Sequence, residues 1–264
     1  MRISILGCGW LGLPLALRLK ELGHSLRGSV TSEQRAGELH SLGLDIHVIN
    51  LHTSRSESLH GFLEGTELLI ICVPPAKESA ETSMVKALDE FLKIAEHLKI
   101  QRIIFTSSIG VYPNTEDLGI CHEEDVAEDP AGKQEYLLRL ESLVLDCQSE
   151  SSVIFRLGGL IGGDRHPVNY LAGRKKLPNG EGPVNLIHRE DCIDAILTAI
   201  NQAPPREVYN LVYPDYPTRK NYYLKKARQL QLPEPHFLRE PSVGKVVSSE
   251  AFVRDTDFVF KAGI

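Results

Sequence analysis

The sequence predicts an α/β protein with a doubly wound parallel sheet, followed by a small C-terminal lobe. In the first half, short apolar runs of strand length alternate with longer segments in which apolar residues recur every three or four positions. Beyond about residue 158, glycine and proline become denser and the helical segments become shorter. We therefore expect a core over residues 1–160 and a lobe over 161–264 that returns one strand, near 207–212, to the sheet.

The individual elements follow from this periodicity in order. The run 3–6 is apolar and of strand length, whereas leucines recur every four positions along the next segment, which is typical of a helix. Thr31 and Ser32 suit a helix start because their hydroxyls cap free amides. The expected order is strand 3–6, helix 10–22, strand 26–30, helix to about 42, strand 44–49, strand 68–73, helix 81–99, strand 102–106, helix 134–147 and strand 153–157. In the second half, the same reasoning predicts helix 191–200, strand 208–212 and helix 221–230.

The composition argues against several classes of protein. The net charge is −6 and no stretch concentrates lysine and arginine, so a nucleic-acid partner is not expected. The five cysteines form no Cys-x-x-Cys pair, and the carboxylates at 123–125 are not spaced as metal ligands. No apolar run is long enough to span a bilayer. We expect a cytoplasmic protein with no metal and no membrane partner, with a homodimer left open.

A glycine pattern follows the first expected strand directly and opens the first expected helix. It reads Gly-Cys-Gly-Trp-Leu-Gly over 7–12. Glycines at these spacings allow a tight turn, a close approach of main chain to a diphosphate, and close contact between helix and strand, as in Rossmann-type folds. The alternative is a turn that serves packing alone. We expect the turn to bind a nicotinamide dinucleotide through Gly7, Gly9, Trp10, Leu11 and Gly12.

The end of the second expected strand bears on which dinucleotide is bound. NAD-binding proteins usually carry an acid there, which holds the adenosine ribose. This chain has Thr31 and Ser32 instead, followed by Arg35. These residues favour NADP, because Ser32 and Arg35 suit a 2′-phosphate. The alternatives are NAD as the cofactor and Arg35 as a solvated helix residue.

A second motif lies at the end of the strand expected at 102–106. Residues 103–112 read Ile-Ile-Phe-Thr-Ser-Ser-Ile-Gly-Val-Tyr. This segment resembles the Thr-Ser-Ser-x-x-Val-Tyr motif of extended short-chain dehydrogenase/reductases. The resemblance continues through 155–167 and 184–191, and with the glycine turn it is strongest to the atypical YeeZ-like group of that superfamily. It implies an NAD(P)-binding protein of the epimerase/dehydratase kind.

The resemblance also implies roles for individual residues. Ser108 matches the catalytic Ser/Thr position of the superfamily. The residues expected by resemblance to line the cofactor are Val73, Pro74, Pro75, Thr106 and Ser107, with Leu157, Gly158 and Gly159 near the nicotinamide.

The sequence departs from the superfamily at its catalytic Tyr-x-x-x-Lys pair. The lysine of that pair lowers the pKa of the tyrosine so that the phenol exchanges a proton near neutrality. Here the position four residues after Tyr136 is Leu140, and an alignment on Glu141 puts Lys133 and Leu137 at the two positions. The motif is absent, which the atypical group also commonly shows.

Three residues are candidates to replace that pair. A guanidinium from Arg139 would lower the pKa of Tyr136, although an aromatic residue on such a helix more often only packs. Tyr112 follows Ser108 closely in sequence and would either donate a hydrogen bond to a substrate oxygen or form a wall of the pocket. The imidazole of His188 is a side chain of the type used in acid–base catalysis, but a helix cap explains this histidine equally well.

Two hypotheses about function remain open at this point. The first is an NAD(P)-dependent oxidoreductase, epimerase or dehydratase acting on a small carbonyl, hydroxyl or sugar-nucleotide-like substrate, held by Arg165, His166 and Asn185. The second is a sensor or scaffold that binds the dinucleotide without turnover. The missing Tyr–Lys pair is the reason that the second stays open.

Overall fold

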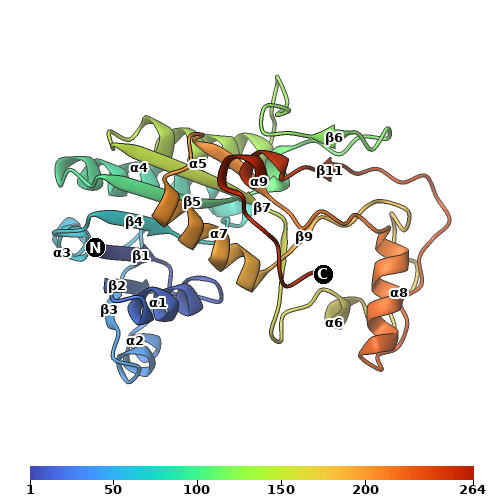
Figure 1. The fold of residues 1–264 in the computed structure, drawn as a ribbon, viewed down its shortest axis with the longest axis horizontal. Helices are drawn as coiled ribbons and strands as arrows, with labels where there is room; N and C mark the ends of the chain where they lie inside the picture. The colour runs from blue at the N-terminus through green and yellow to red at the C-terminus, as the bar shows by residue number, and fades with distance from the viewer. The chain divides into compact units, whose positions relative to one another are not determined.

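The computed structural model describes residues 1–264, whose helices and strands are drawn in Figure 1. The chain divides into two compact units, each made of segments that are distant in sequence. Unit 1 comprises residues 1–107, 131–155 and 205–208, and unit 2 comprises residues 108–130, 156–204 and 209–264.

A seven-stranded sheet is the central element of the fold, and its order confirms the predicted doubly wound architecture. From one edge to the other it runs β10 (Val208–Leu211), β7 (Ser151–Leu157), β5 (Arg102–Ser108), β4 (Leu68–Ile71), β1 (Arg2–Leu6), β2 (Ser25–Val30) and β3 (Asp45–Val48). In unit 1, β1 pairs in parallel with β2 and β4, β2 with β3, and β4 with β5. The carboxyl ends of these five strands therefore meet at one edge, where ligands bind to sheets of this kind.

The helices of unit 1 form because each carries an apolar face. They are α1 (Gly12–Glu21), α2 (Glu33–His40), α3 (Ser56–Leu63), α4 (Glu81–His97) and α5 (Lys133–Asp146). In α1 the buried residues Leu15, Ala16 and Leu19 recur at helical spacing. This helix begins two residues later than predicted, because the chain is still turning up to Leu11.

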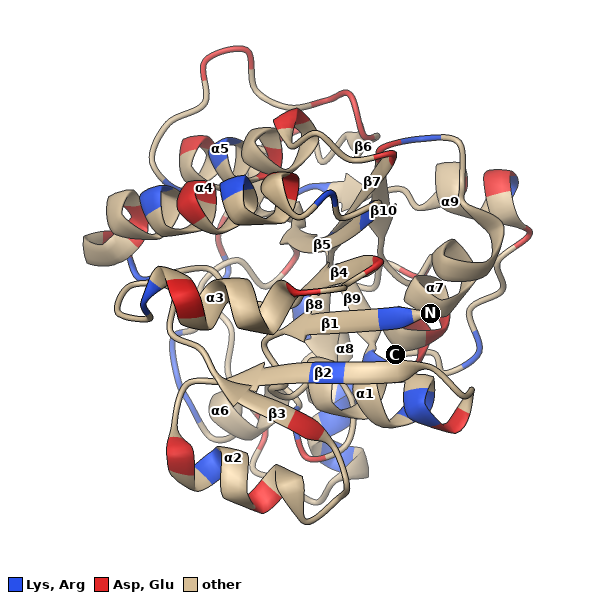
Figure 2. Cartoon of the chain, turned by 90° about the vertical axis from the view of Figure 1, so that its left-hand side faces the viewer, with Lys and Arg blue, Asp and Glu red and all other residues tan.

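Helix α3 was not predicted from the sequence. Its buried residues are Leu59, Phe62 and Leu63, and three apolar positions within eight residues are too few to establish a helical period. Contacts place α4 beside both α3 and α5. Figure 2 shows charged residues of both signs interspersed along α2 and α4.

Unit 2 has strands of only two or three residues and an apolar cluster of its own. Its elements are β6 (Ile120–Cys121), β8 (Gly159–Ile161), α6 (Val168–Leu171), β9 (Leu186–His188), α7 (Arg189–Gln202), α8 (Arg219–Gln229), β11 (Val246–Val247) and α9 (Glu250–Thr256). Strand β8 pairs in parallel with β9, and β11 with β6. The buried cluster consists of Ile161, Val168, Val184, Leu186, Tyr222, Tyr223 and Ala227.

The end of the chain is hydrogen-bonded to the start of α7. The main-chain amides of Lys261 and Ala262 donate to the buried carboxylate of Asp191 at 2.8 and 3.1 Å. A carboxylate buried in this way needs such donors to offset its lost hydration. No helix of the structure combines the length and apolar character needed to cross a lipid bilayer.

Candidate functional site

The glycine turn between β1 and α1 has the geometry that a close main-chain approach requires. Gly7 has a φ of +101°, and a Cβ there would lie 2.8 Å from the carbonyl oxygen of Cys72. A Cβ at Gly12 would lie 2.2 Å from the carbonyl oxygen of Gly7, so α1 packs directly on the turn. A Cβ at Gly9 would meet nothing within 4 Å. Two of the glycines are therefore demanded by packing, whereas Gly9 faces open space.

Strand β2 holds this turn from the side. Ser29 accepts two hydrogen bonds from it: the N–H of Cys8 donates to the Ser29 carbonyl at 2.7 Å, and the N–H of Gly7 donates to Oγ at 2.9 Å. Ser29 is buried, and a Cβ at the neighbouring Gly28 would lie 2.5 Å from Sγ of Cys8. The position of the turn thus depends on a serine that is 22 residues away in sequence.

The start of α1 suits an anion. No acidic residue lies in the first turn, and no side chain caps the helix at Leu11. The N–H of Leu13 donates to the Gly9 carbonyl and Pro14 has no N–H, so the partial positive charge at this end comes mainly from the helix dipole. A diphosphate is the group that such a turn and helix start would accept.

A cavity of about 410 Å³ extends from this turn along the carboxyl edge of the sheet in unit 1. Its walls come from the ends of β1, β2 and β3 and from the segment after β4. The lining residues are Leu6, Gly7, Ser29, Val30, Thr31, Ile49, Asn50, Leu51, His52, Val73, Pro74, Pro75, Ala76, Lys77, Ser79, Ala80 and Met84. They include no aspartate or glutamate, so no carboxylate is there to hold a ribose or to repel a phosphate.

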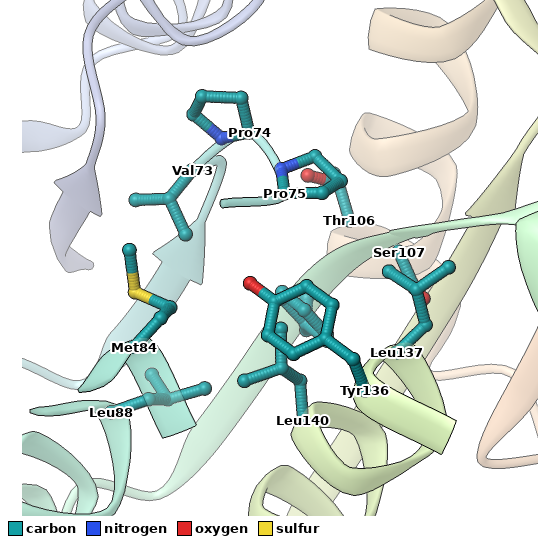
Figure 3. A pocket seen from close by; sticks show the side chains of 11 residues that line it. Val73, Pro74, Pro75, Met84, Leu88, Thr106, Ser107, Tyr136, Leu137 and Leu140 are labelled. Carbon is teal, nitrogen blue, oxygen red and sulfur yellow. The ribbon is translucent and has the colours of Figure 1, made fainter. Parts of the chain in front are cut away.

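A smaller crevice of about 10 Å³ adjoins the segment after β4 and is drawn in Figure 3. Val73, Pro74 and Pro75 belong to both hollows, together with Met84. The far wall of the crevice is Tyr136 of α5, whose hydroxyl accepts a hydrogen bond from the Ala76 N–H at 3.0 Å.

Burial raises the pKa of Tyr136, and the Glu81 carboxylate acts in the same direction. The main-chain amide of Ala76 opposes this shift, but no guanidinium contributes. The possibility that Arg139 lowers the pKa of Tyr136 therefore finds no support in the structure. At neutral pH the phenol keeps its proton.

The other residues expected at the cofactor differ in where they lie. Thr31 lines the cavity, whereas Ser32 and Arg35 do not. Oγ of Ser32 caps α2, and the Arg35 guanidinium pairs with Glu38 one turn along the same helix. The hydroxyl of Ser107 donates to the buried carboxylate of Glu141.

Ser108 is the last residue of β5. Its Oγ accepts a hydrogen bond from the Gly110 N–H at 3.1 Å, which leaves the hydroxyl hydrogen to donate elsewhere. Gly158 and Gly159 both lie against β9, because a Cβ at Gly158 would come within 3.0 Å of the Asn185 carbonyl oxygen and one at Gly159 within 2.8 Å of Leu186. Within unit 2, their lack of side chains is explained by packing, and Leu157 before them is buried in β7.

Tyr112 is enclosed within unit 2 and is only 1% exposed. Its hydroxyl donates to Oδ1 of Asn210 at 2.6 Å and accepts from the Arg156 guanidinium at 2.8 Å. Burial raises the pKa of Tyr112 to about 12, despite the opposing effect of Arg156. This buried hydroxyl finds both its acceptor and its donor within the chain, in β10 and β7. The structure therefore does not support the expectation that Tyr112 donates to a substrate.

The remaining candidates in unit 2 also have structural partners. Nδ1 of His188 accepts from the Glu190 N–H and caps α7. The Asn185 side chain bridges the main chain of Lys245 and Val247. The explanation of His188 as a helix cap, one of the two left open by the sequence, thus accounts for its observed contact.

His166 belongs to the aromatic cluster of unit 2. One ring nitrogen accepts from the Val168 N–H, and the other lies 2.9 Å from the Tyr222 hydroxyl. Burial, aided by the positive charge of Lys226, lowers the pKa of His166 to about 4, so the ring is neutral at pH 7. Arg165 lies in the turn before it, where its main chain pairs with Gly162.

Comparison with known proteins identifies the relatives of this chain. No family model matches it. Protein YeeZ of Escherichia coli K12 is 32% identical to it over 268 residues, which cover 98% of this chain and 96% of YeeZ. The chain belongs to the YeeZ family. The resemblance expected from the glycine turn and the Thr-Ser-Ser motif is confirmed.

Solved structures share the fold of this YeeZ-family chain. A short-chain dehydrogenase/reductase superfamily protein from Agrobacterium tumefaciens with bound NAD is 17% identical, with a TM-score of 0.79 over 99% of this chain and 93% of that one. UDP-glucuronic acid 4-epimerase from Bacillus cereus, in complex with NAD, is 14% identical, with a TM-score of 0.78 over 100% and 93%. At these identities the likeness establishes the fold alone.

Sequence reasoning missed several residues that form the cavity of the YeeZ-family chain. Ser29 and the segment 50–52 line it, as do Ala76 and Lys77. Their one common signal is position, since each lies near or just after the carboxyl end of an expected strand of the parallel sheet. That rule, applied to β3 and β4 as well as β1, would have found segment 50–52 and the residues after Pro75.

Proposed function

We propose that this YeeZ-family chain binds NAD or NADP in the cavity of unit 1 and acts as an NAD(P)-dependent oxidoreductase or epimerase/dehydratase. The glycine turn carries this proposal. Gly9 has open space beyond it, while Gly7 and Gly12 are fixed by packing, so the turn exposes main chain only where a diphosphate would approach. Of the turn residues 7–12, only Gly7 lines the cavity, which is of the size of small-molecule sites.

The sheet order gives the proposed direction of the cofactor. With the diphosphate at β1, the adenosine half lies over β2 and β3, where dinucleotide folds hold it. Thr31, Asn50 and His52 then face the adenosine. The nicotinamide half extends past β4 toward β5, and Val73, Pro74 and Pro75 form its wall. This apolar wall excludes water from the reacting end.

The bound nicotinamide would supply reversible hydride transfer to or from a substrate carbon. Ser108 would donate its free hydroxyl hydrogen to the reacting oxygen of the substrate. A small carbonyl or hydroxyl compound, such as a sugar nucleotide, is the substrate class that we propose. The fold shared with a UDP-glucuronic acid epimerase supports that class.

The choice between NAD and NADP stays a prediction. The absence of a carboxylate from the cavity wall removes the usual partner of an unphosphorylated ribose and is compatible with a 2′-phosphate. The pairing of Arg35 with Glu38 opposes the role that we expected for this arginine. An exchange of partner would be needed before Arg35 held a phosphate.

A second function is favoured by one observation. Burial raises the pKa of both Tyr112 and Tyr136, so neither has the lowered pKa of a proton-exchanging tyrosine. A protein with such tyrosines would be suited to act as a sensor that binds the dinucleotide and converts no substrate.

Titration of the purified protein with NADH and NADPH tests the proposal. We expect enhanced nicotinamide fluorescence and a rise in melting temperature that increases with cofactor concentration. The absence of both effects for both cofactors would refute binding.

Single-turnover absorbance of the reduced nicotinamide, with candidate carbonyl compounds, then separates the two functions. Oxidation of bound cofactor supports the enzyme, and tight binding without any oxidation supports the sensor.

A further inference from the structure

An exposed basic surface lies in unit 2, on two segments that are distant in sequence. Segment 173–177 runs beside segment 233–239. The N–H of Leu177 donates to the His236 carbonyl at 2.9 Å, and the N–H of Leu238 donates to the Leu177 carbonyl at 2.8 Å. The exposed cations of the two segments, which we call the basic surface, are Arg174, Lys175, Lys176 and Arg239. The pairing of the segments thus gathers positive charge from positions that are far apart in the chain.

The carboxylates next to this basic surface already have partners. Glu181 pairs with Lys220 at 3.7 Å, and Glu234 pairs with Arg228 at 2.7 Å. The carboxylate of Glu240 accepts a hydrogen bond from a main-chain amide at 3.0 Å. The four cations of the basic surface form no ion pair within the chain. Their charge is therefore available to a partner from outside.

An acidic surface lies in unit 2 as well, on the loop 113–130. This loop contains seven carboxylates and no lysine or arginine. Its exposed carboxylates, which we call the acidic surface, are Glu116, Asp117, Glu124, Asp125, Glu128 and Asp129. None of them forms an ion pair within the chain. Like charges at this spacing repel one another, so an approaching cationic surface would stabilise the loop.

Segment 240–244 joins the two surfaces. On one side, the N–H of Thr115 donates to the Gly244 carbonyl at 2.8 Å, directly before the acidic surface begins. On the other side, the N–H of Val243 donates to Oδ1 of Asn179 at 3.0 Å, and Nδ2 of Asn179 donates to the Val243 carbonyl at 2.8 Å. Figure 1 shows this part of the chain leading from α8 to β11, which pairs with β6. The basic and acidic surfaces are therefore neighbours, with segment 240–244 between them.

Apolar side chains are exposed on and beside these surfaces. Ile120 in the acidic loop is 62% exposed, Leu238 beside the basic surface is 43% exposed, and Val243 between the two surfaces is 41% exposed. Exposed apolar side chains with charged neighbours are typical of a surface that another protein covers. A suitable occupant must bring apolar area together with charges of both signs.

We propose that this face is the contact between two copies of the chain, related by a two-fold axis at segment 240–244. The acidic surface of each copy then faces the basic surface of the other, and the exposed apolar side chains meet between them. A second copy supplies both complementary charges at once, whereas a nucleic acid would be repelled by the acidic surface. The proposal concerns assembly and does not depend on whether a cofactor binds.

Sedimentation velocity of the purified chain in about 50 mM and about 500 mM sodium chloride tests the contact. We expect a dimer at the lower salt concentration and about a tenfold higher dissociation constant at the higher one, because salt screens exposed charges. A chain that stays monomeric up to about 100 μM at the lower salt concentration would overturn the proposal. So would a dimer whose dissociation constant is the same at both salt concentrations.

Charge-reversed variants test which surfaces meet. The basic-reversed variant carries Arg174→Glu and Lys175→Glu, and the acid-reversed variant carries Glu116→Lys and Glu124→Lys. All four side chains are exposed, so both variants should keep the melting temperature of the wild type. Each variant alone should dimerise about tenfold more weakly than wild type. An equimolar mixture should recover the dimer, since the intact acidic surface of one variant then meets the intact basic surface of the other.

A control variant separates this contact from an effect of net charge. Arg55→Glu with Lys86→Glu makes the same change in charge at exposed positions of unit 1, and it should dimerise as wild type does. Equal weakening in this control, or a mixture of folded variants that dimerises no better than each alone, would overturn the proposal. A monomeric wild-type chain that binds duplex DNA through the basic surface would assign that surface to another occupant and would overturn it as well.

Discussion

Alanine substitutions at two glycines of the turn should have opposite effects on stability and on binding. A Cβ at Gly12 would lie 2.2 Å from the carbonyl oxygen of Gly7, which is main chain and has no freedom to swing aside. A Cβ at Gly9 would meet no atom within 4 Å, and Gly9 does not have a left-handed φ. Gly12→Ala thus tests packing, and Gly9→Ala tests the approach of a ligand.

The magnitudes follow from these contacts. Relief of a 2.2 Å overlap requires α1 to move away from β1, and overpacking of this kind costs about 1–3 kcal/mol. In a protein of this size, that corresponds to a fall in melting temperature of roughly 2–10 °C. Gly9→Ala should leave the melting temperature unchanged or raise it slightly, because alanine restricts the unfolded chain. Its methyl group would keep a diphosphate from the turn, and we expect at least a tenfold higher Kd, about 1.4 kcal/mol or more.

Differential scanning fluorimetry without ligand and fluorescence titration with NADH measure the two effects on the same samples. The decisive result is a Gly9→Ala protein that is as stable as wild type and binds NADH poorly. If this variant bound NADH as tightly as wild type, the outer side of the turn would not face the diphosphate, and the proposed role of Gly9 would be wrong. If it were destabilised as much as Gly12→Ala, the packing argument would fail.

Three other predictions concern stability and reactivity. Ser29→Ala removes the acceptor of the half-buried Gly7 N–H, and urea unfolding should show a loss of about 1–3 kcal/mol that Ser29→Thr largely avoids. Equal midpoints for wild type and the alanine variant would contradict this. For His166, the folded pKa of about 4 lies below the unfolded value of 6.5, so the unfolded chain binds a proton first. The free energy of unfolding therefore falls as pH drops from about 6.5 to about 4, by at most about 1.4 kcal/mol per pH unit. His166→Gln should flatten that part of the pH profile, and an unaltered slope would count against the assignment. Burial raises the pKa of Cys8 to about 11, so iodoacetamide at pH 8 should label it in guanidinium and hardly at all in the native protein, as peptide mass spectrometry would reveal.

The sequence by itself determined the class of fold and the place of the glycine turn. Both are local properties. A strand or helix of sufficient length repeats its apolar pattern, whereas Gly7 adopts a backbone conformation that favours glycine and Gly12 leaves room for the Gly7 carbonyl. Family membership followed from the same continuous segments. Where the apolar pattern was short, as in α3, the local sequence was insufficient to predict the helix.

The tertiary structure alone decided what each candidate side chain does. Tyr112 and Tyr136 are both buried tyrosines. The hydroxyl of Tyr112 is enclosed by Asn210 and Arg156, whereas that of Tyr136 accepts from the Ala76 N–H beside the small crevice. Their partners lie 98, 44 and 60 residues away in sequence. Burial, hydrogen-bond partners and the resulting pKa values depend on such distant neighbours, and no periodicity in the chain encodes them.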